Sequence, residues 1–301
     1  MDEVMKKQND VALFRAGKVI SAVAKNSNLV FSPASINSIF REIASFILVD
    51  RSEKGGPKIA SVNGVWIEQS LPSSPKSKEL FENFFKADFA QVDFISNVKS
   101  CFQTIKIYGN ALYFKGAWEN KFDKSMTIHK PFHLVNGKQA YNGFKVLKLP
   151  YQQGDNNKRR QFSMCFFLPD TKDGLDKLVE EMTCTDGFLD NHIPRWKDRV
   201  GEFRIPKFKI EFGFEASRTF GEIELNVSLY HKALIEIDED GGAEAAAATA
   251  LCCVYGSMTY LPPPPVDFVA DHPFLFLIRE DKTGTVLFAG KVFDPSVSSS
   301  T

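Results

Sequence analysis

The sequence has no excess of charge of either sign, because its 37 Lys and Arg residues balance its 37 Asp and Glu residues. This balance argues against a strongly basic nucleic-acid binder. Long apolar runs are also missing: no stretch is long enough to span a membrane, and the N-terminus, MDEVMKKQND, is charged throughout. We therefore expect a cytoplasmic protein without a signal peptide that binds neither nucleic acid nor membrane. Extracellular release by a non-classical route stays open.

Cysteine is scarce: the five residues are irregularly spaced and include no CxxC pair. An odd, irregular set predicts reduced thiols rather than a disulfide framework. His129 and His133 have the i, i+4 spacing of two metal ligands on a helix, but Pro131 lies between them, so we expect no metal site. The sequence also lacks GxSxG, Walker and Rossmann patterns. We expect no cofactor and no enzymatic activity.

What the chain does have is an ordinary globular composition, 44% apolar over 301 residues, with 28 Phe residues that favour sheet. Periodicity predicts helices over 11–25, 35–49, 72–88 and 173–181. Predicted strands are 28–33, 58–68, 105–114, 162–168, 203–214, 233–237, 274–278 and 286–292. Pro206 suggests that 203–214 is a pair of strands with a kink. Helices and strands mix without regular βαβ alternation, so we expect one α+β domain over 1–301.

The most unusual segment is 238–266, DEDGGAEAAAATALCCVYGSMTYLPPPPV, which connects two predicted strands. A connection this long is uncommon in a compact domain unless it is functional or disordered. Its alanine run, 243–250, favours an exposed helical turn or loop on composition alone. As a strand, the run would instead carry only small residues on one face and Glu244 on the other, and could slide between existing strands. The small face would consist of Ala243, Ala245, Ala247 and Thr249.

Several motifs of the sequence together match one known protein family. HKALIEIDEDGGAEAAAATA is similar to the serpin hinge region, and FVADHPFLFLIREDKTGTVLFAGKVFDP is similar to the C-terminal block. FSPASI at 31–36, GNALYFKGAW at 109–118 and LDNHIPR at 189–195 also match. YNGFKVLKLPY at 141–151 and RQFSMCFFLPD at 160–170 resemble the plant branch.

The resemblance implies a fold with a large central mixed sheet, smaller sheets and surrounding helices. It also implies a function, because serpins are suicide inhibitors of serine proteases, and of some papain-like cysteine proteases. The target protease cleaves an exposed loop, here about 241–265. The N-terminal part of the loop then inserts into the central sheet as a new strand and carries the acyl-enzyme with it.

Residue roles follow from the same resemblance. Gly242 and Ala243 match the hinge that enters the sheet first, and Glu244 matches an outward-facing acid. The small run that follows comprises Ala245, Ala246, Ala247 and Ala248. Family spacing places the scissile bond between Gly256 and Ser257, whereas counting back from the C-terminal block places it between Ser257 and Met258. A buried polar cluster under the opening point of the sheet is expected from Ser32, Asn110 and His272, and an aromatic residue at the top of the sheet from Trp118.

The chain is shorter than typical serpins, and several helices are expected to be missing. The shortened places follow Asn37, lie between Phe94 and Ile105, cover 136–141, and lie between Phe220 and His231. Two functions therefore stay open: a protease inhibitor, or a non-inhibitory serpin-like protein that acts as a loop substrate, a binding module or a non-functional shortened product. Because 243–265 contains no Lys or Arg, we expect target proteases with small or apolar preferences rather than trypsin-like enzymes.

Overall fold

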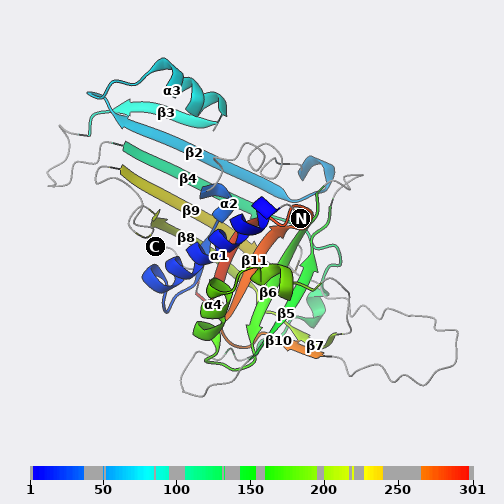
Figure 1. The fold of residues 1–301 in the computed structure, drawn as a ribbon. Helices are drawn as coiled ribbons and strands as arrows, with labels where there is room; N and C mark the ends of the chain where they lie inside the picture. Colours follow the sequence, from blue (N-terminus) through cyan, green and yellow to red (C-terminus); the bar gives the residue numbers. More distant parts are fainter. Residues whose placement is uncertain are drawn as a thin grey trace.

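The computed structural model describes residues 3–36, 50, 52–84, 86–94, 106–130, 132, 143–153, 160–194, 200–216, 219, 227–239 and 266–297. These residues form two five-stranded sheets and one two-stranded sheet, with helices packed beside them (Figure 1). None of the described helices is both long enough and apolar enough to cross a membrane.

The first five-stranded sheet is mixed and has the strand order β3-β2-β4-β9-β8. Its strands are β2 (Lys58–Glu68), β3 (Ala87–Val92), β4 (Lys106–Lys115), β8 (Phe208–Glu215) and β9 (Val227–Ile237). The β2–β3 and β4–β9 pairs are parallel, and the β2–β4 and β8–β9 pairs are antiparallel. This is the large mixed sheet that the sequence predicts.

The second five-stranded sheet is antiparallel and has the order β1-β12-β11-β6-β5. Its strands are β1 (Leu29–Phe31), β5 (Phe144–Pro150), β6 (Phe162–Pro169), β11 (Phe274–Glu280) and β12 (Val286–Val292). Every residue of β6, β11 and β12 is buried, which explains why these strands are continuous apolar runs. The two-stranded sheet pairs β7 (Val200–Arg204) with β10 (Val266–Val269).

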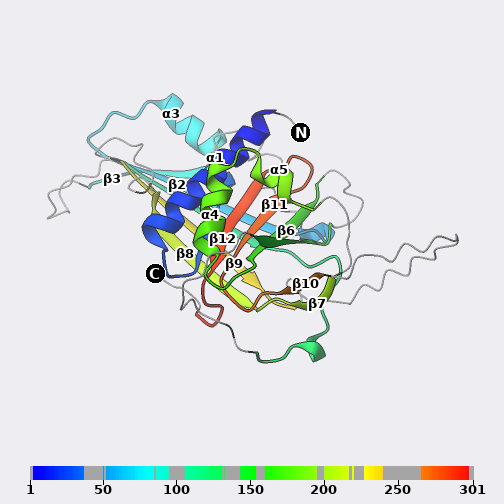
Figure 2. The ribbon, with the colours of Figure 1, turned by 60° about the horizontal axis from the view of Figure 1, so that its bottom comes forward.

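The helices are α1 (Glu3–Val23), α2 (Pro33–Ile36), α3 (Pro75–Glu79), α4 (Leu175–Cys184) and α5 (Phe188–His192). One turn of π-helix, Leu80–Phe84, follows α3, and 3-10 turns occupy Ser52–Lys54 and Lys124–Met126. The helix α1 lies beside α4 and against β12 (Figure 2). The buried Lys291 holds the chain just past the C-terminal end of α1, because its Nζ donates to the carbonyls of Ala24 and Lys25.

Phenylalanine fills the core between the two large sheets. Phe114 of the mixed sheet makes edge-on contacts with Phe162 and Phe288 of the antiparallel sheet, with ring centroids 6.1 Å apart in each case. Phe31 and Phe214 make another contact of this kind, at 6.4 Å. Such pairs add to the free energy gained from burying the rings. The high Phe count therefore serves to hold one sheet against the other.

Two predictions from the sequence are wrong in detail. The helix predicted over 72–88 ends earlier, because Ala87 already starts β3. The strands predicted to pair with each other within 203–214 do not: β7 pairs with β10, and β8 pairs with β9. Pro206 lies in the short link between β7 and β8, and that link sends the chain from one sheet to another rather than into a hairpin.

Candidate functional site

The candidate site is the seam where β4 and β9 meet in the centre of the mixed sheet. These two strands pair in parallel over nine residue pairs, from Lys106 opposite Val227 to Phe114 opposite Ile235. No strand lies between β4 and β9, so the seam is closed. The chain leaves the C-terminal end of β9 directly into the segment in which the sequence predicts a hinge and a reactive loop.

A chain of hydrogen bonds crosses this seam on its core side. The backbone N–H of Ser32 donates to Nε2 of His231 at 2.9 Å, and Nδ1 of His231 lies 2.9 Å from Oδ1 of Asn110. The amide Nδ2 of Asn110 then donates to Oδ1 of Asn63 at 2.6 Å. Asn63, Asn110 and His231 are cross-strand neighbours on β2, β4 and β9. We call this chain of four residues the relay.

The relay fixes the protonation state of its histidine. A backbone N–H can only donate, so Nε2 of His231 must carry a lone pair and the proton must sit on Nδ1. Nδ1–H then donates to Asn110, and every bond in the relay has one donor and one acceptor. Burial lowers the pKa of His231 to about 3 because the low-dielectric core disfavours the imidazolium. The neutral imidazole therefore ties β9 to β4.

An aromatic stack lies at the end of the seam where β4 terminates. The buried ring of Trp118 stacks on Tyr151 with centroids 4.3 Å apart and an angle of 8° between the rings. The two residues also form an isolated β-bridge. Nε1 of Trp118 is buried and has no hydrogen-bond partner among the residues that the structure describes, which is unusual for a buried indole N–H.

The chain is anchored at the same end of the seam, just before the predicted hinge. The Glu239 carboxylate, two residues beyond β9, forms an ion pair with Lys207 and accepts a hydrogen bond from Oγ1 of Thr127 at 2.9 Å. Lys207 precedes β8, and Thr127 follows the turn after β4. The hydrogen bond from Lys207 is the main cause of a lowered pKa of Glu239. The carboxylate thus holds the chain at the point where it leaves the sheet.

The structure brings only some of the predicted site residues together. Ser32 and Asn110 both belong to the relay, but His231 joins them, and His272 does not. The ring of His272 bonds instead to the carboxylate of Asp271 and to the carbonyl of Pro169, each at 2.8 Å. The placement of His272 in the cluster is therefore corrected. Trp118 lies beyond the end of β4, at the end of the sheet where β9 leads into the loop.

His231 and Asn63 are not among the site residues that the sequence predicts. The sequence does contain a sign of His231, because in HKALIEI this histidine lies on the same face as the apolar residues at 233, 235 and 237. The strand was predicted to start only at Ala233, which left this histidine outside the sheet.

The predictions for the loop itself fall outside the described residues. They concern the hinge and small run, Gly242, Ala243, Glu244, Ala245, Ala246, Ala247 and Ala248, and the bond between Gly256 and Ser257. These assignments stay predictions. Of the two histidines considered for a metal, only His129 is among the described residues, and within that part of the chain no group of His, Cys, Asp and Glu side chains could hold a metal ion.

Comparison with known proteins identifies the family. The family model described as Serpin (serine protease inhibitor) matches residues 95–229 and 215–295. This chain belongs to the serpin family. Serpin-Z2 of Arabidopsis thaliana is 52% identical over an alignment of 373 residues, which covers 100% of this chain and 91% of that relative. "Probable non-inhibitory serpin-Z5" of the same plant is 51% identical, over 98% of this chain and 85% of that relative. The family is described as one of protease inhibitors, not of enzymes.

Solved structures show the same fold. The native stressed conformation of Arabidopsis AtSerpin1 superposes with a TM-score of 0.84 at 37% identity and covers 99% of this chain and 100% of that one. Uncleaved ovalbumin has a TM-score of 0.70 at 18% identity, over 95% of this chain and 99% of that one. Because the Serpin-Z2 alignment is longer than the 301 residues of this chain, that relative carries residues which this serpin lacks.

Proposed function

We propose that this serpin inhibits proteases by offering its loop for cleavage and then inserting 243–250 between β4 and β9. The observation that carries the proposal is the closed parallel seam, which meets the loop at the end of β9. A segment that leaves β9 and turns back would run antiparallel to both strands. One parallel pair would become two antiparallel pairs, which are slightly more stable per residue.

The relay and the small face of the loop support this proposal. A strand that enters the seam must separate His231 from Asn110, so the hydrogen bond between them stabilises the closed sheet. The entering strand must also fit a face packed against the core. Ala243, Ala245 and Ala247 would present only methyl groups there, and a large or charged side chain would carry a heavy penalty.

We propose further that the targets prefer small or apolar side chains. The segment 243–265 contains no Lys or Arg, and the neighbours of Gly256 in the sequence include Val254, Tyr255 and Met258. Elastase-like, chymotrypsin-like and papain-like enzymes accept such side chains. Trypsin-like enzymes read a basic side chain with a buried acid in the specificity pocket, and this segment offers none.

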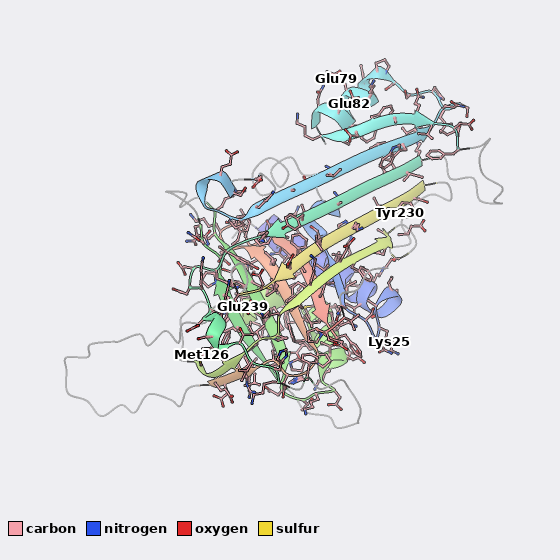
Figure 3. All side chains as sticks on the ribbon, turned by 180° about the vertical axis from the view of Figure 1, so that it is seen from behind. Lys25, Glu79, Glu82, Met126, Tyr230 and Glu239 are labelled. Atoms are coloured by element: carbon pink, nitrogen blue, oxygen red, sulfur yellow. The ribbon has the colours of Figure 1, made fainter. Side chains whose placement is uncertain are left out.

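A second candidate function is that of a serpin that does not inhibit. It is favoured by the 51% identity to a relative named as a probable non-inhibitory serpin. It is also favoured by the mixed sheet itself, because no described helix crosses the outer face of β2, β4 and β9 (Figure 3). A sheet with less covering its outer face is held closed by fewer contacts. It would relax sooner, and the metastable state needed for trapping would be shorter-lived.

One experiment distinguishes the two functions. The protein is mixed with chymotrypsin-like, elastase-like and papain-like proteases, and the products are separated on denaturing gels. An inhibitor gives an adduct with a protease that survives SDS, at close to one protein per protease. A non-inhibitory serpin gives only the clipped chain while the protease stays active, and that result would overturn the first proposal.

A further inference from the structure

The outer face of the mixed sheet carries an exposed apolar surface. Val62 is 64% exposed and Tyr230 is 48% exposed, and Trp66 is also exposed. All three side chains lie on the face opposite the relay, because β2 and β9 alternate between core and solvent. In Figure 3 this face is turned toward the viewer with Tyr230 labelled, and α1 lies behind the sheet. Exposed apolar patches of this kind mark interaction surfaces.

Two glycines make the surface flat in its centre. Gly64 and Gly109 are cross-strand neighbours, and the indole ring of Trp66 lies over both of them. A Cβ at Gly109 would lie 2.9 Å from Cζ3 of that ring, and one at Gly64 would collide with it. The indole therefore lies against the sheet and widens the apolar surface between Val62 and Tyr230.

Acidic residues lie at both edges of the same surface. Asp88 of β3 pairs with Gly64, and Glu215 of β8 pairs with Tyr230, so both occupy the cross-strand row that runs through the glycines. Five strands separated by ~4.8 Å make this row ~19 Å long. We call the surface of Val62, Trp66, Tyr230 and Asp88 the sheet patch.

The outer side of α1 has the complementary character. Val11 is 46% exposed and Phe14 is 50% exposed, although the opposite side of α1 is buried in the core. Lys18 places its Nζ 4.8 Å from the centroid of the Phe14 ring, and Lys25 is exposed just beyond the helix end. The spacing of 3 and 4 residues places Val11, Phe14 and Lys18 on one side of α1, and Lys25 follows the C-terminal end of the helix. We call them the helical patch.

We propose that the sheet patch binds the helical patch of a second copy of this chain, so that molecules assemble head to tail. Apolar side chains would meet apolar side chains, and the lysines of α1 would face the acidic edges of the sheet. The lengths agree: from Val11 to its end at Val23, α1 covers ~18 Å at 1.5 Å per residue, close to the length of the row across the strands.

The geometry also determines the kind of assembly. The two patches belong to opposite sides of the molecule, since α1 lies toward the viewer in Figure 1 and behind the mixed sheet in Figure 3. A contact between two different surfaces leaves one free patch at each end of every dimer. Such a contact grows into open chains unless a rotation closes it into a ring. The association requires neither loop cleavage nor strand insertion.

The test measures mass against concentration by analytical ultracentrifugation of the uncleaved protein. The wild-type protein should associate, and Phe14→Asp or Val62→Asp should each weaken association at least tenfold, about 1.4 kcal/mol, because either change replaces an apolar side chain in the contact by a carboxylate that must lose its hydration. Val11→Asp and Tyr230→Asp repeat the test at a second position of each patch. Met126→Asp is the matched control, because Met126 is 74% exposed and lies outside both patches.

Mixing the variants tests the head-to-tail arrangement. The Phe14→Asp chain keeps its sheet patch and the Val62→Asp chain keeps its helical patch, so an equal mixture should form dimers that grow no further. A wild-type protein that stays monomeric at the highest attainable concentration would overturn the proposal. Equal weakening by Met126→Asp would overturn it too, as would a mixture that forms no dimers. The same holds if Phe14→Asp and Val62→Asp each still assemble alone, which is expected for association through loop insertion.

Discussion

Nδ1 of His231 and Oδ1 of Asn110 lie 2.9 Å apart across the seam between β9 and β4. The bond joins the two strands of the seam through their side chains, so a strand that enters between β4 and β9 must break it. The other bond of the same ring, from the backbone N–H of Ser32 to Nε2, exists only while the imidazole is neutral, because Nε2 must accept it. The closed state of the sheet is therefore coupled to the protonation of one buried histidine.

The first prediction concerns pH. The pKa of His231 is about 3 in the folded chain and lies near 6.5 in the unfolded one, so below pH 6.5 only the unfolded state takes up this proton. Stability is therefore lost as the pH falls from 6.5 toward 3, by about 2 kcal/mol between pH 7 and pH 5. His231→Gln should remove this part of the pH dependence in urea unfolding.

The matched control for that measurement is His272→Gln, which changes a histidine outside the relay. It should keep the loss of stability between pH 7 and pH 5 that His231 causes. If His231→Gln and the wild-type protein show the same pH dependence, His231 does not stay neutral in the closed sheet.

The second prediction concerns the anchor at the hinge. Glu239→Gln removes the ion pair with Lys207, which is half exposed, so the loss in stability should be below about 1 kcal/mol. The rate at which the uncleaved loop enters the sheet on warming should nevertheless rise, because the chain is released where it leaves β9. Native gels after timed incubation would follow the relaxed form.

An ion pair between β8 and β9 provides a control for Glu239→Gln. Glu236 pairs with Lys209 at 3.2 Å, between the strands β9 and β8, but does not hold the hinge. Glu236→Gln should leave the rate of relaxation unchanged. Equal acceleration by both variants would mean that loss of any cross-strand charge, rather than release of the hinge, controls the opening.

The third prediction concerns protease class. Trypsin should neither form an adduct through the loop nor cleave within 243–265, whereas chymotrypsin-like and elastase-like enzymes should cleave there. Mass spectrometry of brief digests would locate the cut. Introducing a basic residue by Gly256→Arg should make the loop a trypsin site, and trypsin cleavage of the unchanged loop would contradict the specificity argument.

The sequence predicts the buried strands better than the polar ones. The runs in β6, β11 and β12 are apolar throughout because both faces are covered, and they are found where expected. By contrast, β9 was predicted only from Ala233, although it begins at Val227. In its first half the polar His231 occupies a core-facing position, where an apolar residue is expected. The pattern of a half-buried strand is therefore not recognisable there from the sequence.

The candidate site depends on contacts that are remote in sequence. Ser32 and His231 are 199 residues apart, and Asn110 and His231 are 121 residues apart, so no local pattern reports either bond. The family resemblance named Ser32 and Asn110 for this cluster together with His272 of the C-terminal block, whose ring bonds elsewhere. Only the strand register, which sets Asn110 opposite His231, identifies the residue that completes the relay.

The central claim is that 243–250 can enter the seam between β4 and β9 with its small face toward the core. The most direct measurement is the melting temperature before and after cleavage of the loop, for the wild-type protein, Ala247→Arg and Ala248→Arg. Cleavage should raise the melting temperature of the wild-type protein and of Ala248→Arg by at least about 10 °C, several kcal/mol for a chain of this size. It should not raise that of Ala247→Arg, because the arginine would face the packed side of the sheet. An equal rise in all three proteins, or none in the wild-type protein, would contradict the account.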